Sequence, residues 1–147
     1  MMEELKKEFL DKIAMIKDVE GIASLCNWDQ HTYMPENALE TKIRQMTFLQ
    51  SYYHELISSK ELGNLVDKLS DYQMDNPRWQ ALLRVVKRER KRLTKLPKSL
   101  IEKMAKTEAE GLESWKRTVA QNDYNIFKPS LGKLVELKRE EAKCVSE

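Results

Sequence analysis

The chemistry available to this chain depends first on its two histidines, because imidazole is the side chain that most often binds metals or transfers protons near neutral pH. His54 begins the run His-Glu-Leu-Ile-Ser on a predicted helix. A zinc-peptidase helix needs a second histidine four residues later, so that both imidazoles project from one face, and Ser58 stands there instead. His54 and Glu55 are therefore half of a motif, and we expect His54 to be an exposed or hydrogen-bonded helix residue.

The other candidate groups do not complete a site. His31 lies near Cys26 and Asp29, but a Cys-x-x-Asp-x-His spacing matches no defined metal site, and tetrahedral zinc needs a fourth ligand. The sequence has no Gly-x-Ser-x-Gly elbow, and its four scattered glycines cannot form a phosphate-binding loop. Cys26 and Cys144 are expected to be reduced thiols. We therefore expect no catalytic residue, no metal ligand and no cofactor in this chain.

Composition predicts a soluble, cytoplasmic, helical protein. The chain has 147 residues, of which 41% are hydrophobic and 34% charged, a balance too apolar for disorder and too charged for a membrane protein. The longest uncharged stretch, residues 45–54, is far too short to span a bilayer, and the N-terminus has no apolar signal-peptide run. Only four glycines and four prolines interrupt the sequence, which favours long helices.

Apolar residues recur at three- and four-residue steps along most of the chain. This periodicity predicts an all-α fold, an antiparallel helical bundle of about five to six helices in a single domain, residues 1–147. Asn76 followed by Pro77 is typical of a helix start, and Pro35 should end a helix by Tyr33 or precede a new one. We expect helices over 3–26, 36–58, 59–69, 77–96 and 97–121, with a last one starting near 129–130 and a break over 27–37.

One segment is strongly basic. Residues 84–98 hold eight lysines and arginines against one acid, Glu89, whereas the rest of the chain has a net charge of −5. Six of these bases recur at helical steps and should form one helix face. Such a face is typical either of phosphate binding or of a solvated scaffold surface, and the second is far more common.

Residues 28–35 read Trp-Asp-Gln-His-Thr-Tyr-Met-Pro and resemble the W-D-x-x-T-x-M-P segment of the carboxypeptidase Taq family of metallocarboxypeptidases. Residues 54–63 are similar to the family's H-E-L-x-x-S-x-E-L-G, and 86–97 resemble its basic helix ending in Leu-Pro. Residues 115–127 and 134–142 resemble its next two helices. The candidate site residues are the signature positions, expected to be structural or to wall a cleft: Trp28, Asp29, Thr32, Tyr33, Met34 and Pro35.

The resemblance implies a mostly helical fold and a relation to much longer enzymes that remove C-terminal residues from peptides. Those enzymes hold a metal, usually zinc, with an H-E-x-x-H helix and a later glutamate, both downstream of the region that matches. Neither element occurs here, so the resemblance carries over no metal ligand or catalytic residue. It also implies that residues 84–98 form a scaffold surface.

Three functions follow as hypotheses. The first is an N-terminal helical fragment or truncated homologue of a zinc-dependent carboxypeptidase, inactive alone. The second is a repurposed helical protein-interaction module, and the third a basic nucleic-acid-binding domain. We expect self-association, as a homodimer, or a catalytic-domain partner, and no membrane. We also expect Trp28, Tyr33 and Met34 to be packing residues in a fixed turn that Asp29 holds.

Overall fold

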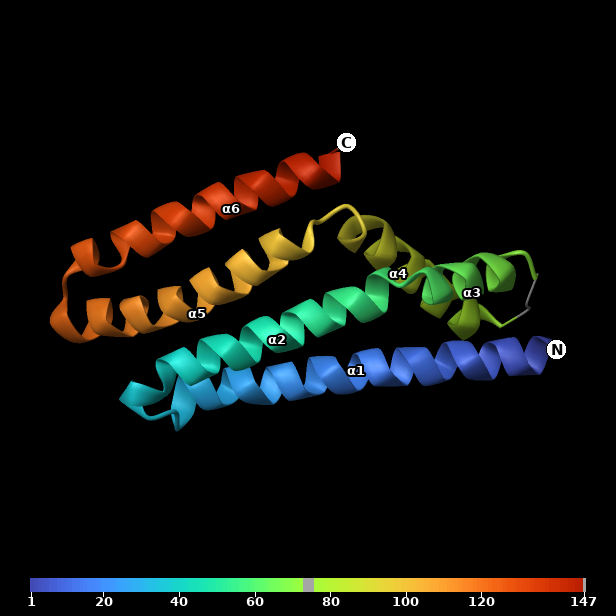
Figure 1. Ribbon diagram of the computed structural model, residues 1–147, viewed down its shortest axis with the longest axis horizontal. Helices are drawn as coiled ribbons and strands as arrows, with labels where there is room; N and C mark the ends of the chain where they lie inside the picture. The colour runs from blue at the N-terminus through green and yellow to red at the C-terminus, as the bar shows by residue number, and fades with distance from the viewer. Residues whose placement is uncertain (73–75, 147) are drawn as a thin grey trace.

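The computed structural model describes residues 1–72 and 76–146, and within them every regular element is helical. The all-α prediction is therefore confirmed. Figure 1 shows the elements in chain order. They are α1 (Met2–Thr32), the 3-10 helix η1 (Glu36–Ala38), α2 (Leu39–Ser58), α3 (Lys60–Ser70), α4 (Pro77–Leu93), α5 (Lys98–Gln121), the 3-10 helix η2 (Tyr124–Ile126) and α6 (Lys128–Ser146).

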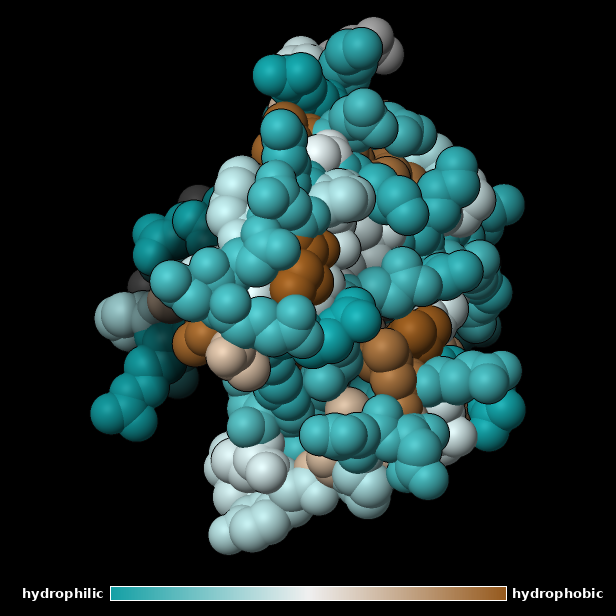
Figure 2. Space-filling view, turned by 90° about the vertical axis from the view of Figure 1, so that its left-hand side faces the viewer, coloured by the Kyte–Doolittle hydropathy of each residue, from teal (hydrophilic) through white to brown (hydrophobic). Residues whose placement is uncertain are grey.

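Four long helices lie side by side in the order α1, α2, α5, α6, and each runs antiparallel to its neighbour (Figure 1). The shorter α3 and α4 pack at one end of this row, where α3 contacts α1 and α4 contacts α2. The fold is thus thicker at the α3–α4 end than at the α5–α6 turn. Viewed from that turn, the surface is mostly hydrophilic, with apolar residues in small separate patches (Figure 2).

The main hydrophobic core lies where α3 and α4 cover α1 and α2. Its most completely buried side chains come from three different helices and bring together residues distant in sequence: Phe9, Leu62, Leu69 and Leu100. Burying a side chain of this size contributes roughly 1.5–3 kcal/mol, so this end supplies most of the hydrophobic stabilisation. A second, smaller cluster of Val19, Ala23 and Leu49 joins α1 to α2.

Small residues on α5 allow it to pack on both sides. Ala105 and Ala109 are buried, and the Ala109 carbonyl accepts a hydrogen bond from α1. Toward α6, a β-carbon on Gly111 would lie 3.3 Å from Leu134 Cδ1, and Ser114 bonds Ser130 across the same contact. The small side chains of α5 therefore let the neighbouring helices approach closely, and the helices pack here without large apolar side chains between them.

The start of α4 confirms the predicted cap. Asn76 accepts hydrogen bonds from the backbone N–H groups of Arg78 and Trp79 at 3.0 and 3.3 Å, with Pro77 at the first helical position. Ser59 caps α3 in the same way through Leu62 N–H.

Two predicted boundaries are wrong. The first helix does not stop near Cys26 but continues to Thr32, because Pro35 disfavours helical geometry only for the residue directly before it. The helix predicted over 77–96 ends at Leu93, because residues 94–96 form a turn before Pro97. The last helix, predicted to start near 129–130, begins at Lys128 and reaches Ser146. No helix within the described residues is long and apolar enough to cross a membrane.

Candidate functional site

A polar groove follows α2 between α1 and α5. Three adjoining hollows, with volumes of 540, 190 and 190 Å³, share Gln50 and Glu108 and so form one continuous feature. We call this feature the α2 groove. Its other polar lining residues include Glu20, Asn27, His31, Tyr53, Glu89, Arg92, Lys138 and Glu141.

The lysine and arginine side chains that line the α2 groove already form ion pairs within the protein. Arg92 bonds Glu141 at 3.3 Å, and Lys138 lies 3.1 Å from Glu141 and 3.7 Å from Glu108. Tyr53 is half-buried beside the carboxylates of Glu20 and Glu89. Burial first, and these two negative charges second, raise the pKa of the Tyr53 phenol, so it remains a neutral hydrogen-bond donor. No pair of the described residues in the groove forms a nucleophile with its base.

His54 serves the fold rather than a metal. It is 8% exposed, and its Nε2 lies 2.9 Å from the Leu93 carbonyl oxygen at the end of α4. Because a carbonyl only accepts, Nε2 carries the proton. This confirms the expected hydrogen-bonded helix histidine. Glu55 next to it forms an ion pair with Lys98 instead of facing a metal.

The residues that the structure describes contain no group of three or more His, Cys, Asp or Glu side chains able to hold a metal ion. His31 is exposed, and Cys26 is a free thiol partly covered by α2. The donor sets required for zinc are therefore not assembled in this part of the chain.

Asp29 holds the turn between α1 and α2, as predicted. Its carboxylate accepts a hydrogen bond from Lys42 Nζ at 2.7 Å, and Lys42 is only 6% exposed. The Asp29 carbonyl also accepts from the N–H groups of Tyr33 and Met34 at 3.0 and 2.9 Å. Backbone and side chain of one residue thus join the end of α1 to α2. Thr32 adds a local bond to the Trp28 carbonyl at 2.8 Å.

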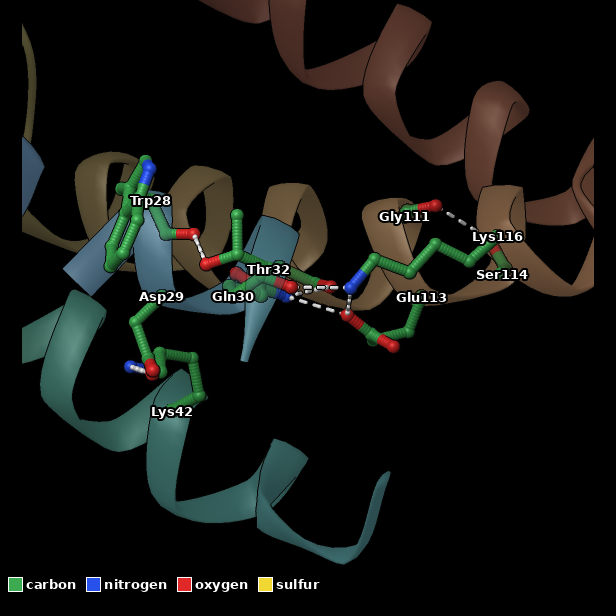
Figure 3. A network of polar contacts seen from close by, with 10 residues as sticks. Trp28, Asp29, Gln30, Thr32, Lys42, Gly111, Glu113, Ser114 and Lys116 are labelled. Carbon is green, nitrogen blue, oxygen red and sulfur yellow. Dashed lines mark hydrogen bonds and ion pairs between the residues drawn. The ribbon is translucent and has the colours of Figure 1, made fainter. Parts of the chain in front are cut away.

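Sequence reasoning missed Gln30, the most buried residue of the signature segment. It is 2% exposed, and its Nε2 donates to the Ala109 carbonyl at 3.1 Å and to Glu113 at 3.3 Å (Figure 3). Lys116 closes the network by donating to the Gln30 carbonyl and to Glu113 at 3.0 Å. A buried amide whose Nε2 donates to two groups of α5 fixes α1 against α5. The burial of Gln30 could have been predicted from Ala23, which lies seven residues earlier and therefore on the same buried face of the helix.

The expectation that Trp28 and Tyr33 pack in the interior is wrong. They are 56% and 76% exposed and contact each other at the surface, with ring centroids 5.4 Å apart. Because α1 remains helical through this segment, Trp28 points about 200° away from Gln30 around the helix axis. Met34 is partly buried, and Pro35 lies exposed at the turn.

The profile described as carboxypeptidase Taq (M32) metallopeptidase matches residues 8–147. The chain belongs to this family. Thermostable carboxypeptidase 1 of Pyrococcus furiosus is 28% identical over 137 residues, which are 92% of this chain but 27% of that protein. The chain thus spans about a quarter of the length of this family member.

Solved structures of the family share the fold. The crystal structure of BsuCP superposes with a TM-score of 0.87 at 20% identity and covers 96% of this chain and 29% of that one. The Pyrococcus furiosus carboxypeptidase, in its Apo-Mg structure, gives 0.73 at 25% identity over 96% and 28%. The chain corresponds to the N-terminal helical part of these metallopeptidases. The family match does not favour the interaction-module or nucleic-acid hypotheses.

Proposed function

We propose that this chain forms the N-terminal helical wall of a zinc-dependent carboxypeptidase, has no peptidase activity alone, and presents the α2 groove to the peptide substrate. The observation that carries the proposal is that a family match covers nearly the whole chain while its described residues assemble no metal site. The remaining part of the enzyme would supply the zinc, its ligands and the glutamate that activates water.

A chimera tests the complementing role. The aligned segment of Pyrococcus furiosus thermostable carboxypeptidase 1 is replaced by this chain, and C-terminal residue release is measured with and without a chelator. We expect chelator-sensitive activity from the chimera, and neither zinc nor activity from the isolated chain. A folded chimera without activity, or an isolated chain whose activity depends on His54, contradicts the proposal.

The groove role is tested within that chimera by Tyr53→Phe, which removes only the phenol hydroxyl. Loss of one substrate hydrogen bond should raise KM by about fivefold, the equivalent of about 1 kcal/mol, with kcat nearly unchanged. Glu40→Gln is the matched control, because Glu40 is exposed on α2 and does not line the groove. Equal KM values for both variants would show that the groove does not contact the substrate.

We further propose that the chain self-associates as a homodimer through exposed apolar residues on the α1–α2 hairpin. Phe48 is 66% exposed and stacks on Tyr52, whose hydroxyl lies 3.8 Å from Met15 Sδ. Apolar clusters of this kind favour partners. Light scattering over a concentration series should give a dimer mass that Phe48→Gln reduces and Val135→Gln, an exposed control on α6, does not. A single-chain mass throughout refutes the dimer.

A cytoplasmic location is also part of the proposal. It is supported by the absence of a membrane-crossing helix among the described residues and by the unpaired state of Cys26 and Cys144. Cell fractionation with a tagged chain tests it, and recovery in an extracellular or membrane fraction contradicts it.

A further inference from the structure

The fold makes little use of two aromatic residues in the signature segment. Trp28 and Tyr33 lie at the surface, and their rings contact each other with centroids 5.4 Å apart. Neither the indole N–H of Trp28 nor the hydroxyl of Tyr33 has a hydrogen-bond partner in residues 1–72 or 76–146. We call the two rings the aromatic pair. Packing within this chain therefore does not explain them.

The aromatic pair stands on a rigid support. Asp29, between the two residues in sequence, pairs with the buried Lys42 of α2, and Gln30 joins α1 to α5. Figure 3 shows the Trp28 ring projecting away from the bonded side chains of Gln30 and Lys42. Because its backbone is fixed from two sides, the Trp28 ring has less freedom to lose when a partner covers it, which favours binding.

The aromatic pair is separate from the α2 groove. Neither ring lines any of the three hollows of the groove, whereas Asn27, Gln30 and His31 of the same helix do. A protein surface that covers the pair therefore leaves the groove open to a peptide.

The size of the relatives indicates what covers the pair. This chain corresponds to 27% of the Pyrococcus furiosus protein, so most of that protein lies beyond the region that matches. Tryptophan and tyrosine combine a large apolar body with a polar tip, and they are enriched among the residues that dominate protein interfaces. The partner needs an apolar surface with oxygen acceptors at its edge, which another part of a folded protein supplies.

We propose that the aromatic pair is a contact through which the remaining part of the carboxypeptidase docks on this chain. The proposal rests on the proposed function. The docked part covers both rings with apolar side chains and accepts hydrogen bonds from the Trp28 N–H group and the Tyr33 hydroxyl. A second copy of this chain is less favoured, because the proposed dimer contact at Phe48 lies beside Met15, about 20 Å away along α1.

The chimera with the Pyrococcus furiosus carboxypeptidase tests the contact through its stability. Trp28→Ala is compared in the chimera and in the isolated chain by thermal unfolding. We expect a Tm at least about 4 °C lower in the chimera and a change within about 2 °C in the isolated chain, where the ring is exposed. Phe48→Ala is the matched control, because Phe48 is a similarly exposed aromatic residue, and it should leave the Tm of the chimera unchanged.

Iodide quenching of fluorescence gives a second readout that does not depend on stability. The difference between the native sequence and Trp28→Phe isolates the emission of Trp28 from that of the other tryptophans. Iodide should quench this emission in the isolated chain, and less than half as strongly in the chimera, because the ring is then covered.

Stability and activity together separate this inference from the proposed function. An active chimera in which Trp28→Ala is neutral and iodide still reaches Trp28 would refute the docking contact and leave the function standing. A folded, inactive chimera that is destabilised by Trp28→Ala would refute the function and support the contact. An unfolded chimera would count against the contact, because this chain would then not fit the remaining part. A dimer mass that falls with Trp28→Ala and not with Phe48→Gln would assign the pair to a second copy and overturn the proposal.

Discussion

Replacing Gly63 with alanine should destabilise the protein, although alanine is the better helix former. Gly63 lies in α3 with helical backbone geometry, so the substitution alone would stabilise the helix by about 1 kcal/mol. A β-carbon at this position, however, would lie 2.5 Å from Nη2 of Arg90 and 3.3 Å from its Cζ. The guanidinium would have to move.

Arg90 cannot move without losing bonds. Its Nη1 donates to the carbonyls of Ile57 and Ser59, the latter at 2.8 Å, at the point where α2 ends and α3 begins. These carbonyls lie where a helix lacks internal partners, and hydrogen bonds from a charged donor contribute roughly 1.5–3 kcal/mol. Burial lowers the pKa of the Arg90 guanidinium, which still remains charged near neutral pH.

The expected net effect of Gly63→Ala is a loss of about 0.5–2 kcal/mol, which is the loss of one hydrogen bond from the charged guanidinium less the helix gain. In an Arg90→Ala background the space is free, and the same change should stabilise by up to about 1 kcal/mol. Urea unfolding of the four proteins in a double-mutant cycle measures this change of sign. Gly132→Ala is the control, because nothing lies within 4 Å of a β-carbon there, and it should stabilise in both backgrounds. Stabilisation by Gly63→Ala in the native background would refute the reasoning.

Two more predictions concern single residues. Trp28→Ala should change the free energy of unfolding by no more than about 0.5 kcal/mol, because the ring is exposed. Gln30→Ala should lower the free energy of unfolding by about 1–3 kcal/mol, because it leaves polar partners unsatisfied. Thermal melts in which Trp28→Ala is the more destabilising change would contradict the burial pattern. The hydrogen bond from Lys12 lowers the pKa of Glu61 from its ordinary 4.5. The contribution of this ion pair to the stability of the fold is therefore present above that pH and is lost as the pH falls through the lowered pKa. The difference in Tm between the native protein and Glu61→Gln should therefore exist at pH 7 and shrink progressively as the pH falls below 4.5. A pH-independent difference would show that the ion pair is not its cause.

Local rules accounted for most of the secondary structure. Pro35, Pro77 and Pro97 each act on their immediate neighbours, and the caps by Ser59 and Asn76 need only residues two or three positions away. Such signals can be read from sequence because the interactions that produce them are complete within one turn. The absence of a second histidine after His54 is of the same local kind.

The orientation of the signature segment could not be read in this way. Whether Trp28 or Gln30 points inward depends on whether α1 continues past Cys26 and on where α5 lies, and α5 is about 80 residues away in sequence. A tryptophan is usually the better candidate for burial, but the position facing α5 carries an amide whose donors meet the Ala109 carbonyl and Glu113.

The sequence by itself determined that this chain is helical, that residues 84–98 are basic and that the H-E-x-x-H motif is missing. The tertiary structure alone decided which bases are paired, because Glu55 and Glu141 reach Lys98 and Arg92 from α2 and α6. Composition counts charges without regard to distance, whereas an ion pair needs two atoms within about 4 Å. Only folding could bring these two acids within reach of Lys98 and Arg92.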